Sequence, residues 1–378
     1  MKNVFHLLLL IFIVFWSVGC DQRPVISPSG KAIKVGIIAP FTGPKQNKGK
    51  EGLAGIKTAR QLQPLLQNGD RIELILEDDR NNPDLSLKSL QKLVEKEKVS
   101  AIITFSDSEP VLAMAKIADT YKTPILALTA TNPDITEQNH YISQLCFDDN
   151  FQGTVAAIFV RDELLIDKVA VFRNPNRVYS MYLASIFEQK FRSIGGVITD
   201  HINLTDKTDD LAKIVKSVHD KAPELLYLPI KAKEVLLVSE ECRKLFWKPK
   251  MMGSDGLLSY IKAQYGNKLH RLEGLLATDF FVIGMPLSPL GKRARREHGV
   301  ETSTFSALGT EGYAILLDAL NRCSDPENRE CVNHQIRSTT DFTGLAGKIS
   351  IGPDGKARRP LFIESVQAGQ PKFMLKVY

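Results

Sequence analysis

The sequence predicts an α/β fold with two successive, doubly wound units and a mixed tail. Short apolar runs alternate with segments whose apolar residues recur at helical spacing, as in parallel sheets covered by helices on both faces. This alternation stalls over residues 129–150 and then restarts, which divides the chain into two units. The length of 378 residues suffices for two or three domains, and 43% hydrophobic with 24% charged residues is typical of globular proteins.

The first unit begins after residue 31. Buried strands are expected at residues 33–39, 72–76, 101–105 and 124–128. The segments between them carry apolar residues every three or four positions and are expected to be helices, over residues 53–66, 87–94 and 112–118. Strands that alternate with helices in this way favour a parallel sheet.

The second unit repeats this order. Its expected strands lie at residues 169–172, 197–202, 225–228 and 251–252, with a helix over residues 179–191. The last third differs, with a strand over residues 275–282, a helix over 308–320 and short strands within 347–378. A tail of this kind could complete both units by crossing back between them.

The first twenty residues have the layout of an export signal. Lys2 precedes an apolar run over residues 4–16, which is too short to span a membrane as a helix. Residues 17–20, Ser-Val-Gly-Cys, resemble the bacterial lipoprotein box, in which the cysteine becomes the lipid-modified first residue. An ordinary signal peptide with an incidental cysteine is the alternative. We expect a signal peptide over residues 1–19 and a tether, lipidated at Cys20, over residues 20–31. By the same resemblance, Asp21 implies retention at the cytoplasmic membrane.

The remaining cysteines fit an exported protein. Cys323 and Cys331 flank a loop-forming stretch that can bring their sulfur atoms together, so a disulfide is expected. A metal site would need more ligands at close spacing, and His334 is the only nearby candidate. We therefore expect no metal. Whether Cys146 and Cys242 stay free is left open.

Charge and motifs exclude several classes of protein. The net charge of +6 is mild for this length and argues against a nucleic-acid partner. The densest basic run, over residues 292–296, is expected to coat a solvated helix. No phosphate-binding glycine loop, zinc-binding histidine pair or serine nucleophile motif is present in the sequence. We expect no catalytic residues, no cofactor and no enzymatic activity.

Polar residues follow several of the expected strands, where ligands of open α/β sheets gather. Ser108 precedes Pro110 at a helix start and could bind an anion with the helix N–H groups, although it could also serve only as a cap. Thr129 and Thr131 offer hydroxyls after the fourth strand. Asp255 follows a strand of the second unit, where a carboxylate is otherwise typical of a turn.

The order of these segments resembles the periplasmic substrate-binding proteins of branched-chain amino acid ABC transporters, the leucine/isoleucine/valine-binding type. The resemblance covers residues 33–361. It rests on residues 33–44, Glu77-Asp78-Asp79, Asn82-Pro83, Ile117-Ala118, Pro124-Ile125-Leu126, residues 130–136 and Gly253-Ser254-Asp255-Gly256. It implies a type I periplasmic binding fold, with two lobes joined by a hinge of three crossovers. We expect the first lobe at residues 32–148 and 278–350, and the second at residues 149–277 and 351–378.

The resemblance also implies the site. Ser108, Thr129 and Thr131 would hold the α-carboxylate of an amino acid, and Asp255 its α-ammonium group from the other lobe. The aromatic residues Tyr179 and Phe305 would contact the rest of the ligand.

Three lysines depart from the family pattern. Lys48 falls where the family often has an aromatic residue, and Lys231 and Lys233 follow the strand at 225–228. One interpretation is that they point to solvent, as most lysines do. If they face the cleft instead, the ligand carries an extra acidic group or is no simple aliphatic amino acid.

The function implied is a lipid-anchored solute-binding protein on the periplasmic side of the cytoplasmic membrane. It would be a monomer that hands an amino acid or related small carboxylate to an ABC permease. The alternative is a regulatory or sensory lipoprotein that uses the same fold to bind a protein partner or a signal molecule.

Overall fold

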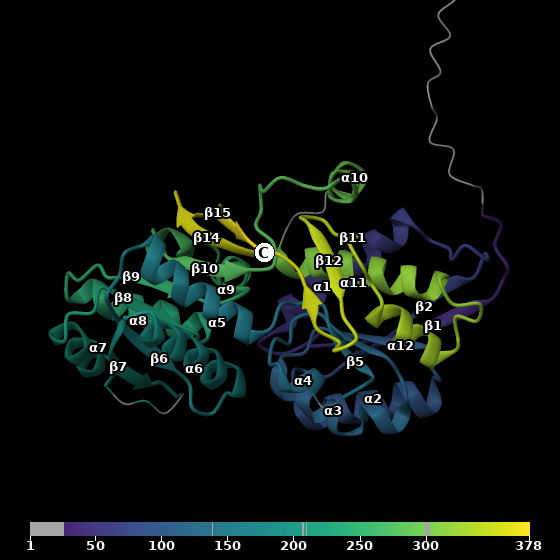
Figure 1. Ribbon diagram of the computed structural model, residues 1–378, viewed down its shortest axis with the longest axis horizontal. Helices are drawn as coiled ribbons and strands as arrows, with labels where there is room; N and C mark the ends of the chain where they lie inside the picture. The colour runs from purple at the N-terminus through teal and green to yellow at the C-terminus, as the bar shows by residue number, and fades with distance from the viewer. Residues whose placement is uncertain (1–25, 138, 206–207, 209, 299–302) are drawn as a thin grey trace, which may run out of the picture.

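The computed structural model describes residues 26–378 apart from residues 138, 206–207, 209 and 299–302. It has two α/β lobes that lie side by side, with C-terminal strands between them (Figure 1). The expected signal peptide, Cys20, Asp21 and part of the expected tether lie outside the described residues. Within the described part of the chain, no helix has both the length and the apolar character needed to cross a membrane.

The first lobe is built on a sheet in the order β2-β1-β3-β4-β5, in which all neighbouring strands are parallel. Both faces of this sheet are apolar and are covered by helices. In β1, for example, Ile37 belongs to one apolar core and the next residue, Ile38, belongs to another. The strands are β1 (Ala32–Ala39), β2 (Arg71–Asp78), β3 (Ala101–Thr104), β4 (Ile125–Ala127) and β5 (Ile142–Gln144), and the helices are α1 (Gln46–Leu62), α2 (Pro83–Gln91), η1 (Lys92–Lys96), α3 (Ser108–Tyr121) and α4 (Asp134–Glu137).

The second lobe is built on a sheet in the order β15-β14-β10-β9-β8-β6-β7. Strands β6 to β10 are parallel to one another, whereas β14 pairs antiparallel with β10 and β15 antiparallel with β14 at one edge. The strands are β6 (Lys168–Arg173), β7 (Val197–Asn203), β8 (Leu225–Leu228), β9 (Lys250–Gly253), β10 (Leu276–Asp279), β14 (Leu361–Gln367) and β15 (Gln370–Val377), and the helices are α5 (Asp149–Ile158), η2 (Phe159–Glu163), α6 (Val178–Ser193), α7 (Leu211–Asp220), α8 (Ala232–Lys244), α9 (Leu257–Tyr265) and η3 (Gly266–Leu272).

The predicted fold class is confirmed, and all eight strands expected in the two units are present. β5 was missed because it has three residues and lies where the apolar rhythm is weakest. The strand expected over residues 275–282 ends at Asp279, since the next residues leave the sheet.

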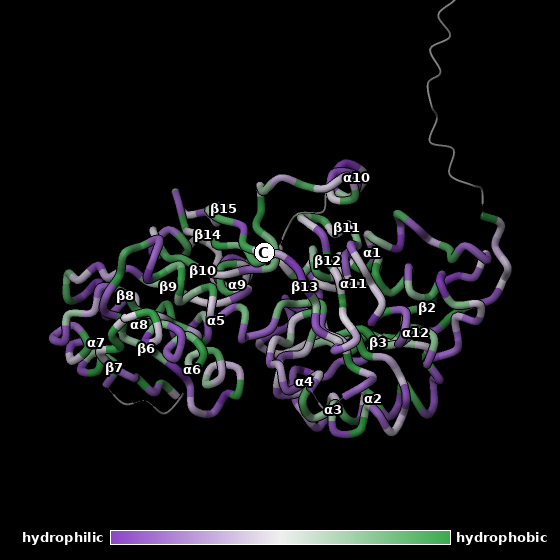
Figure 2. Tube along the Cα trace, in the orientation of Figure 1, coloured by the Kyte–Doolittle hydropathy of each residue, from purple (hydrophilic) through white to green (hydrophobic). Residues whose placement is uncertain are grey.

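The tail contributes α10 (Pro289–His298), α11 (Thr304–Asn321), α12 (Arg329–Arg337) and a small antiparallel sheet of β11 (Phe342–Thr343), β12 (Lys348–Ile351) and β13 (Ala357–Arg358). Helix α11 packs so closely on α1 that there is no room for a side chain at Gly55, where a Cβ atom would collide with the carbonyl oxygen of Ser306. This contact places the start of α11 beside the first lobe. The predicted basic run lies on α10, which is mostly hydrophilic (Figure 2).

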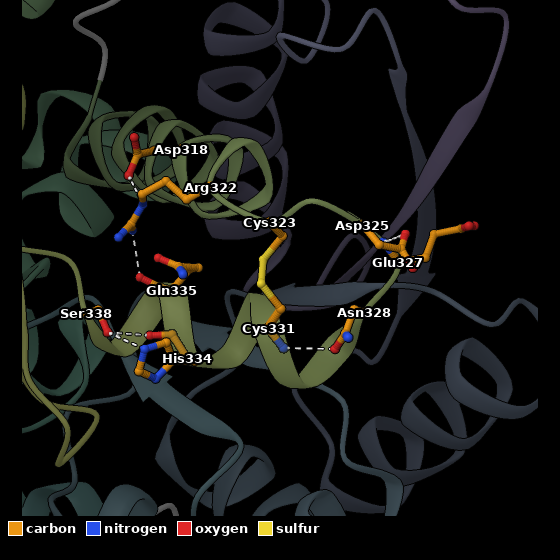
Figure 3. Close-up of a disulfide and its surroundings, with 10 residues drawn as sticks. All are labelled: Asp318, Arg322, Cys323, Asp325, Glu327, Asn328, Cys331, His334, Gln335 and Ser338. Atoms are coloured by element: carbon orange, nitrogen blue, oxygen red, sulfur yellow. Dashed lines mark hydrogen bonds and ion pairs between the residues drawn. A yellow bond between two sulfur atoms is a disulfide. The ribbon is translucent and has the colours of Figure 1, made fainter.

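Cys323 and Cys331 form a disulfide with a Cα–Cα distance of 6.0 Å (Figure 3). It joins the end of α11 to the first turn of α12, where Asn328 accepts a hydrogen bond from the backbone N–H of Cys331 at 3.0 Å. Cys146 and Cys242 are free and buried. Among the described residues, no group of three or more His, Cys, Asp or Glu side chains could hold a metal ion.

The chain passes between the two large sheets three times, after β5, after β10 and before β14. Arg359 lies in the third passage and is 6% exposed. Its guanidinium contacts the backbone of the first and second passages. It donates to the carbonyl of Leu145 at 3.4 Å and to that of Phe280 at 3.1 Å, and it pairs with Glu311 at 2.9 Å. The expected lobe boundary at residue 350 falls within the β12–β13 pair, and the boundaries stay a prediction.

A pair of buried carboxyl groups lies on adjacent strands of the second lobe. Asp279 ends β10, Glu364 belongs to β14, and both are nearly inaccessible. Burial raises the pKa of Asp279 to about 7, and burial together with the nearby Asp279 raises the pKa of Glu364 well above its usual value. Glu364 therefore keeps its proton and donates it to Asp279 in a hydrogen bond.

This pair predicts a pH dependence of stability. Between about pH 4 and pH 7 the unfolded chain loses protons that folded Asp279 and Glu364 retain, so the free energy of unfolding should fall as pH rises, by a few kcal/mol in total. Urea unfolding at several pH values measures this slope. Asp279→Asn should flatten it, and an unchanged slope in that variant would contradict the assignment.

Candidate ligand-binding site

A cavity of about 290 Å³ lies between the two lobes, at the carboxyl ends of strands from both sheets. This volume is near the lower end of ligand pockets and suits a small molecule. Its lining comes from the segments after β1, β3 and β4 on one side and after β6, β8 and β9 on the other, each including part of the helix that follows except after β4, and from the start of α11. The lining residues are Pro44, Lys45, Lys48, Asp107, Ser108, Thr129, Arg177, Tyr179, Ile230, Lys231, Ala232, Lys233, Ser254, Asp255, Leu257, Tyr260, Gln264, Tyr265 and Phe305.

The first lobe presents hydroxyl groups and a helix N-terminus to this cavity. Ser108 is the first residue of α3, and Pro110 follows in its first turn. Thr129 also lines the cavity, and its hydroxyl donates to the carbonyl of Phe105 at 3.1 Å. The positive end of the helix dipole and the free N–H groups of α3 make this wall suitable for a carboxylate.

Thr131 is not part of the lining. The chain turns toward the first crossing after Thr129, and the carbonyl of Thr131 accepts a hydrogen bond from the backbone N–H of Asp149 at 2.9 Å. Its side chain is completely buried behind the wall. Both threonines follow β4, which ends at Ala127, so they lie in an irregular loop in which side chains two residues apart need not face the same way.

The second lobe presents a carboxylate. Asp255 follows β9 in a turn that needs Gly256, whose φ is 68° and whose Cα faces the ring of Phe305. The hydroxyl of Tyr179, in the first turn of α6, donates to Asp255. Burial raises the pKa of Asp255, and hydrogen bonds from Tyr179 and Gln152 oppose this effect. In the described part of the chain Asp255 forms no ion pair, so its negative charge lacks a cation in direct contact.

A cluster of charged residues lies at the same site and joins the two lobes. The carboxylate of Asp107 pairs with Lys48 at 2.6 Å, with Lys45, and across the cleft with Arg177 at 3.3 Å. Asn81 donates to the same carboxylate at 3.2 Å. We call Lys45, Lys48, Arg177 and Asp107 the cation cluster.

Lys48 is only 2% exposed, so the interpretation that it points to solvent is wrong. Burial lowers its pKa to about 7. The pKa of Lys45 is lowered well below its usual value by burial and by the neighbouring Arg177 and Lys48. Lys231 and Lys233 also line the cavity, Lys231 half-buried and Lys233 exposed at its rim.

Aromatic rings form the remaining wall. Phe305 lies in the first turn of α11 and meets Tyr260 edge to face, with 5.0 Å between ring centroids. Tyr265 lies nearby in the lining. Rings of this kind bind the carbon skeleton of a small ligand while the polar groups orient its charged ends.

The cavity thus brings together six of the seven residues singled out in the sequence, and Thr131 is the exception: Ser108, Thr129, Tyr179, Asp255, Phe305 and Lys48. Lys45, Asp107, Arg177 and Tyr260 were missed. For Lys45 and Asp107 a signal was available, because both lie in loops directly after strands whose ends were already under consideration.

Residues 32–371 match the model of the periplasmic binding protein family. An amino acid binding protein of Pseudomonas aeruginosa is 24% identical, over 75% of this chain and 74% of the relative. The Leu/Ile/Val-binding protein BraC3 of Rhizobium johnstonii is 22% identical, over 85% of this chain and 88% of the relative.

Solved structures agree in fold. The leucine binding protein LivK of Thermotoga maritima superposes with a TM-score of 0.84 and 29% identity, over 91% of this chain and 98% of that one. A solute binding protein of an R. palustris ABC transporter, in complex with 4-hydroxybenzoate, gives a TM-score of 0.81 at 20% identity, over 92% and 97% of the two chains. The chain is therefore a member of the periplasmic binding protein family, of the type I fold and the kind associated with branched-chain amino acid transporters.

Proposed function

We propose that this chain is the extracytoplasmic solute-binding protein of an ABC importer and that it binds an amino acid or related small carboxylate between its lobes. The observation that carries the proposal is the placement of complementary groups on opposite walls of one cavity. Ser108, Thr129 and the start of α3 offer donors for a carboxylate on the first lobe, and Asp255 offers a carboxylate for an ammonium group on the second. A zwitterion that bridges the cleft stabilises the closed arrangement more than a ligand with one charged end.

Asp255 favours an amino acid over a simple aromatic acid. Structures with similar folds hold either isoleucine or 4-hydroxybenzoate, so the fold alone does not choose between them. A buried carboxylate without a cationic partner is costly, and the ligand's ammonium group would neutralise it. A benzoate would leave this charge unpaired.

The rest of the proposed role follows from the family. Hinge motion at the three crossings would open and close the cleft, with the lobe boundaries given above. Lipid attachment at Cys20 would keep the monomeric protein at the periplasmic face of the cytoplasmic membrane, beside its permease. The protein would perform no chemistry on its ligand.

A thermal-denaturation screen against amino acids, amides and small aromatic acids tests the proposal. A cognate amino acid at a hundred times its dissociation constant is expected to stabilise the protein by about 2.7 kcal/mol, because it binds only the folded state. Stabilisation by aromatic acids alone would contradict the role assigned to Asp255. No response to any compound would favour the regulatory alternative.

A further inference from the structure

We propose that the ligand carries a second anionic group, as a dicarboxylic amino acid does, and that the cation cluster binds this group. The inference rests on the proposed function and specifies the class of ligand for the same site. It starts from the charges that surround the cavity, which a neutral side chain would leave unbalanced.

The charge balance of the lining is positive. With Lys231 left aside, four of the described residues that line the cavity are basic and two are acidic, namely Lys45, Lys48, Arg177 and Lys233 against Asp107 and Asp255. Asp255 has no ion pair with any of them within the described part of the chain. A zwitterion with a neutral side chain adds no net charge and would leave the excess unchanged.

The excess of positive charge is concentrated around the carboxylate of Asp107. Lys45, Lys48 and Arg177 all pair with Asp107, so three cationic groups share a single negative charge. Their side chains are between 3% and 24% exposed, and water therefore solvates them only in part. Buried charges of one sign are costly unless a counter-charge is close. A second carboxylate on the ligand would supply it.

The ionisation of the lysines agrees with this geometry. The lowered pKa values of Lys45 and Lys48 mean that their charged forms are destabilised in the empty site. An anion placed beside them would raise both values. Binding of a dicarboxylic amino acid somewhat above pH 7 should therefore be accompanied by uptake of a proton from solution, chiefly at Lys48.

The location of the cluster suits a side-chain group. Asp107 immediately precedes Ser108, the residue proposed to hold the α-carboxylate, and Lys45 also lies 5.9 Å from the ring of Tyr260. Arg177 reaches the cluster from the second lobe, two residues before Tyr179. A short acidic side chain could therefore reach these cations while the α-groups stay at Ser108 and Asp255, and it would bind both lobes at once.

Isothermal titration calorimetry on the purified full-length protein tests this with two nearly isosteric pairs, L-glutamate with L-glutamine and L-aspartate with L-asparagine, and with L-leucine. At least one acid is expected to bind tenfold or more tightly than its own amide and than leucine. If neither acid binds more tightly than its own amide and leucine, and an amide or leucine does bind, the inference is wrong while the proposed function stands. If none of the five binds, the inference is wrong, and the proposed function is decided by the wider thermal-denaturation screen described above.

Substitutions in the cation cluster test whether these residues cause the preference for the acid over the amide. Lys45→Met should reduce the ratio of acid to amide affinity to near one while amide binding changes little, and Arg177→Met tests the same ratio from the other lobe. The melting temperature of each ligand-free variant reports whether it folds. Titrations of the acid in two buffers of different ionisation enthalpy measure the proton uptake. A ratio of acid to amide affinity that survives in both variants would overturn the assignment of the cation cluster.

Discussion

Replacement of Asp255 with asparagine is expected to weaken amino acid binding by a factor of roughly 30 to several thousand. The substitution keeps the shape of the side chain and its hydrogen bond with Tyr179 but removes the negative charge that faces the ligand's ammonium group. Loss of one partner of a buried charge pair costs about 2–5 kcal/mol of binding free energy, which corresponds to this range. Titration calorimetry with the cognate ligand measures it directly.

The same variant should be more stable than the wild type when no ligand is present. Burial raises the pKa of Asp255, which means that the ionised group destabilises the folded state at neutral pH. A neutral amide of the same size removes this penalty, so the melting temperature should rise while affinity falls. A variant that merely misfolds would lose both, and the two measurements together separate a binding role from a structural one.

A matched control is available in the same lobe. Asp220 ends α7 and is not part of the lining, and its side chain is 57% exposed. Asp220→Asn changes the net charge of the protein by the same amount and should leave the affinity within about twofold. Equal affinities for wild type and Asp255→Asn would remove the ammonium-binding role, and with it the main argument against a benzoate-like ligand.

The contrast between Asp255 and Asp107 indicates how far the sequence could lead to the site. Asp255 was predictable because it follows a recognisable strand, and the carboxyl ends of parallel strands meet at one edge of a sheet. Asp107 follows a strand as well, but its importance depends on Arg177, seventy residues away and on the other lobe. The pattern of residues within one strand gives no information on how two lobes face each other, so this pairing required coordinates.

The pattern of apolar residues along the chain predicted the fold only in part as well. Long apolar runs such as those of β1 and β6 were predicted because both faces of their sheets are buried. The three-residue strand β5 has too few positions to show a period. Thr131 lies in the irregular loop after β4, where the sequence pattern gives no direction for a side chain, and its part in binding stays a prediction. The sequence pattern did not single out Arg359 either, because its buried position depends on the meeting of three passages that are far apart in the chain.

Arg359→Met is expected to lower the free energy of unfolding by about 3–5 kcal/mol. The guanidinium is the common contact of the three passages, since it bonds to Leu145 and Phe280 and pairs with Glu311. Methionine can fill much of the space, but it leaves the carboxylate of Glu311 buried without its cation, with the side chain 2% exposed. Loss of one partner of a buried ion pair carries a cost of this size. Chemical denaturation measures it.

A double-mutant cycle distinguishes this cause from simple loss of packing. Glu311 also accepts a hydrogen bond from the backbone N–H of Leu345 at 2.7 Å, so Glu311→Met is costly as well. If the pair is responsible, the variant with both substitutions should be less destabilised than the sum of the two single variants, because it contains no unpaired buried charge. Strict additivity would mean that Arg359 acts through its packing and its hydrogen bonds to Leu145 and Phe280, and not through its pairing with Glu311. Because these contacts lie where every passage between the lobes meets, their loss should also raise amide hydrogen exchange at residues 145 and 280, which separates a weakened hinge from a general loss of stability.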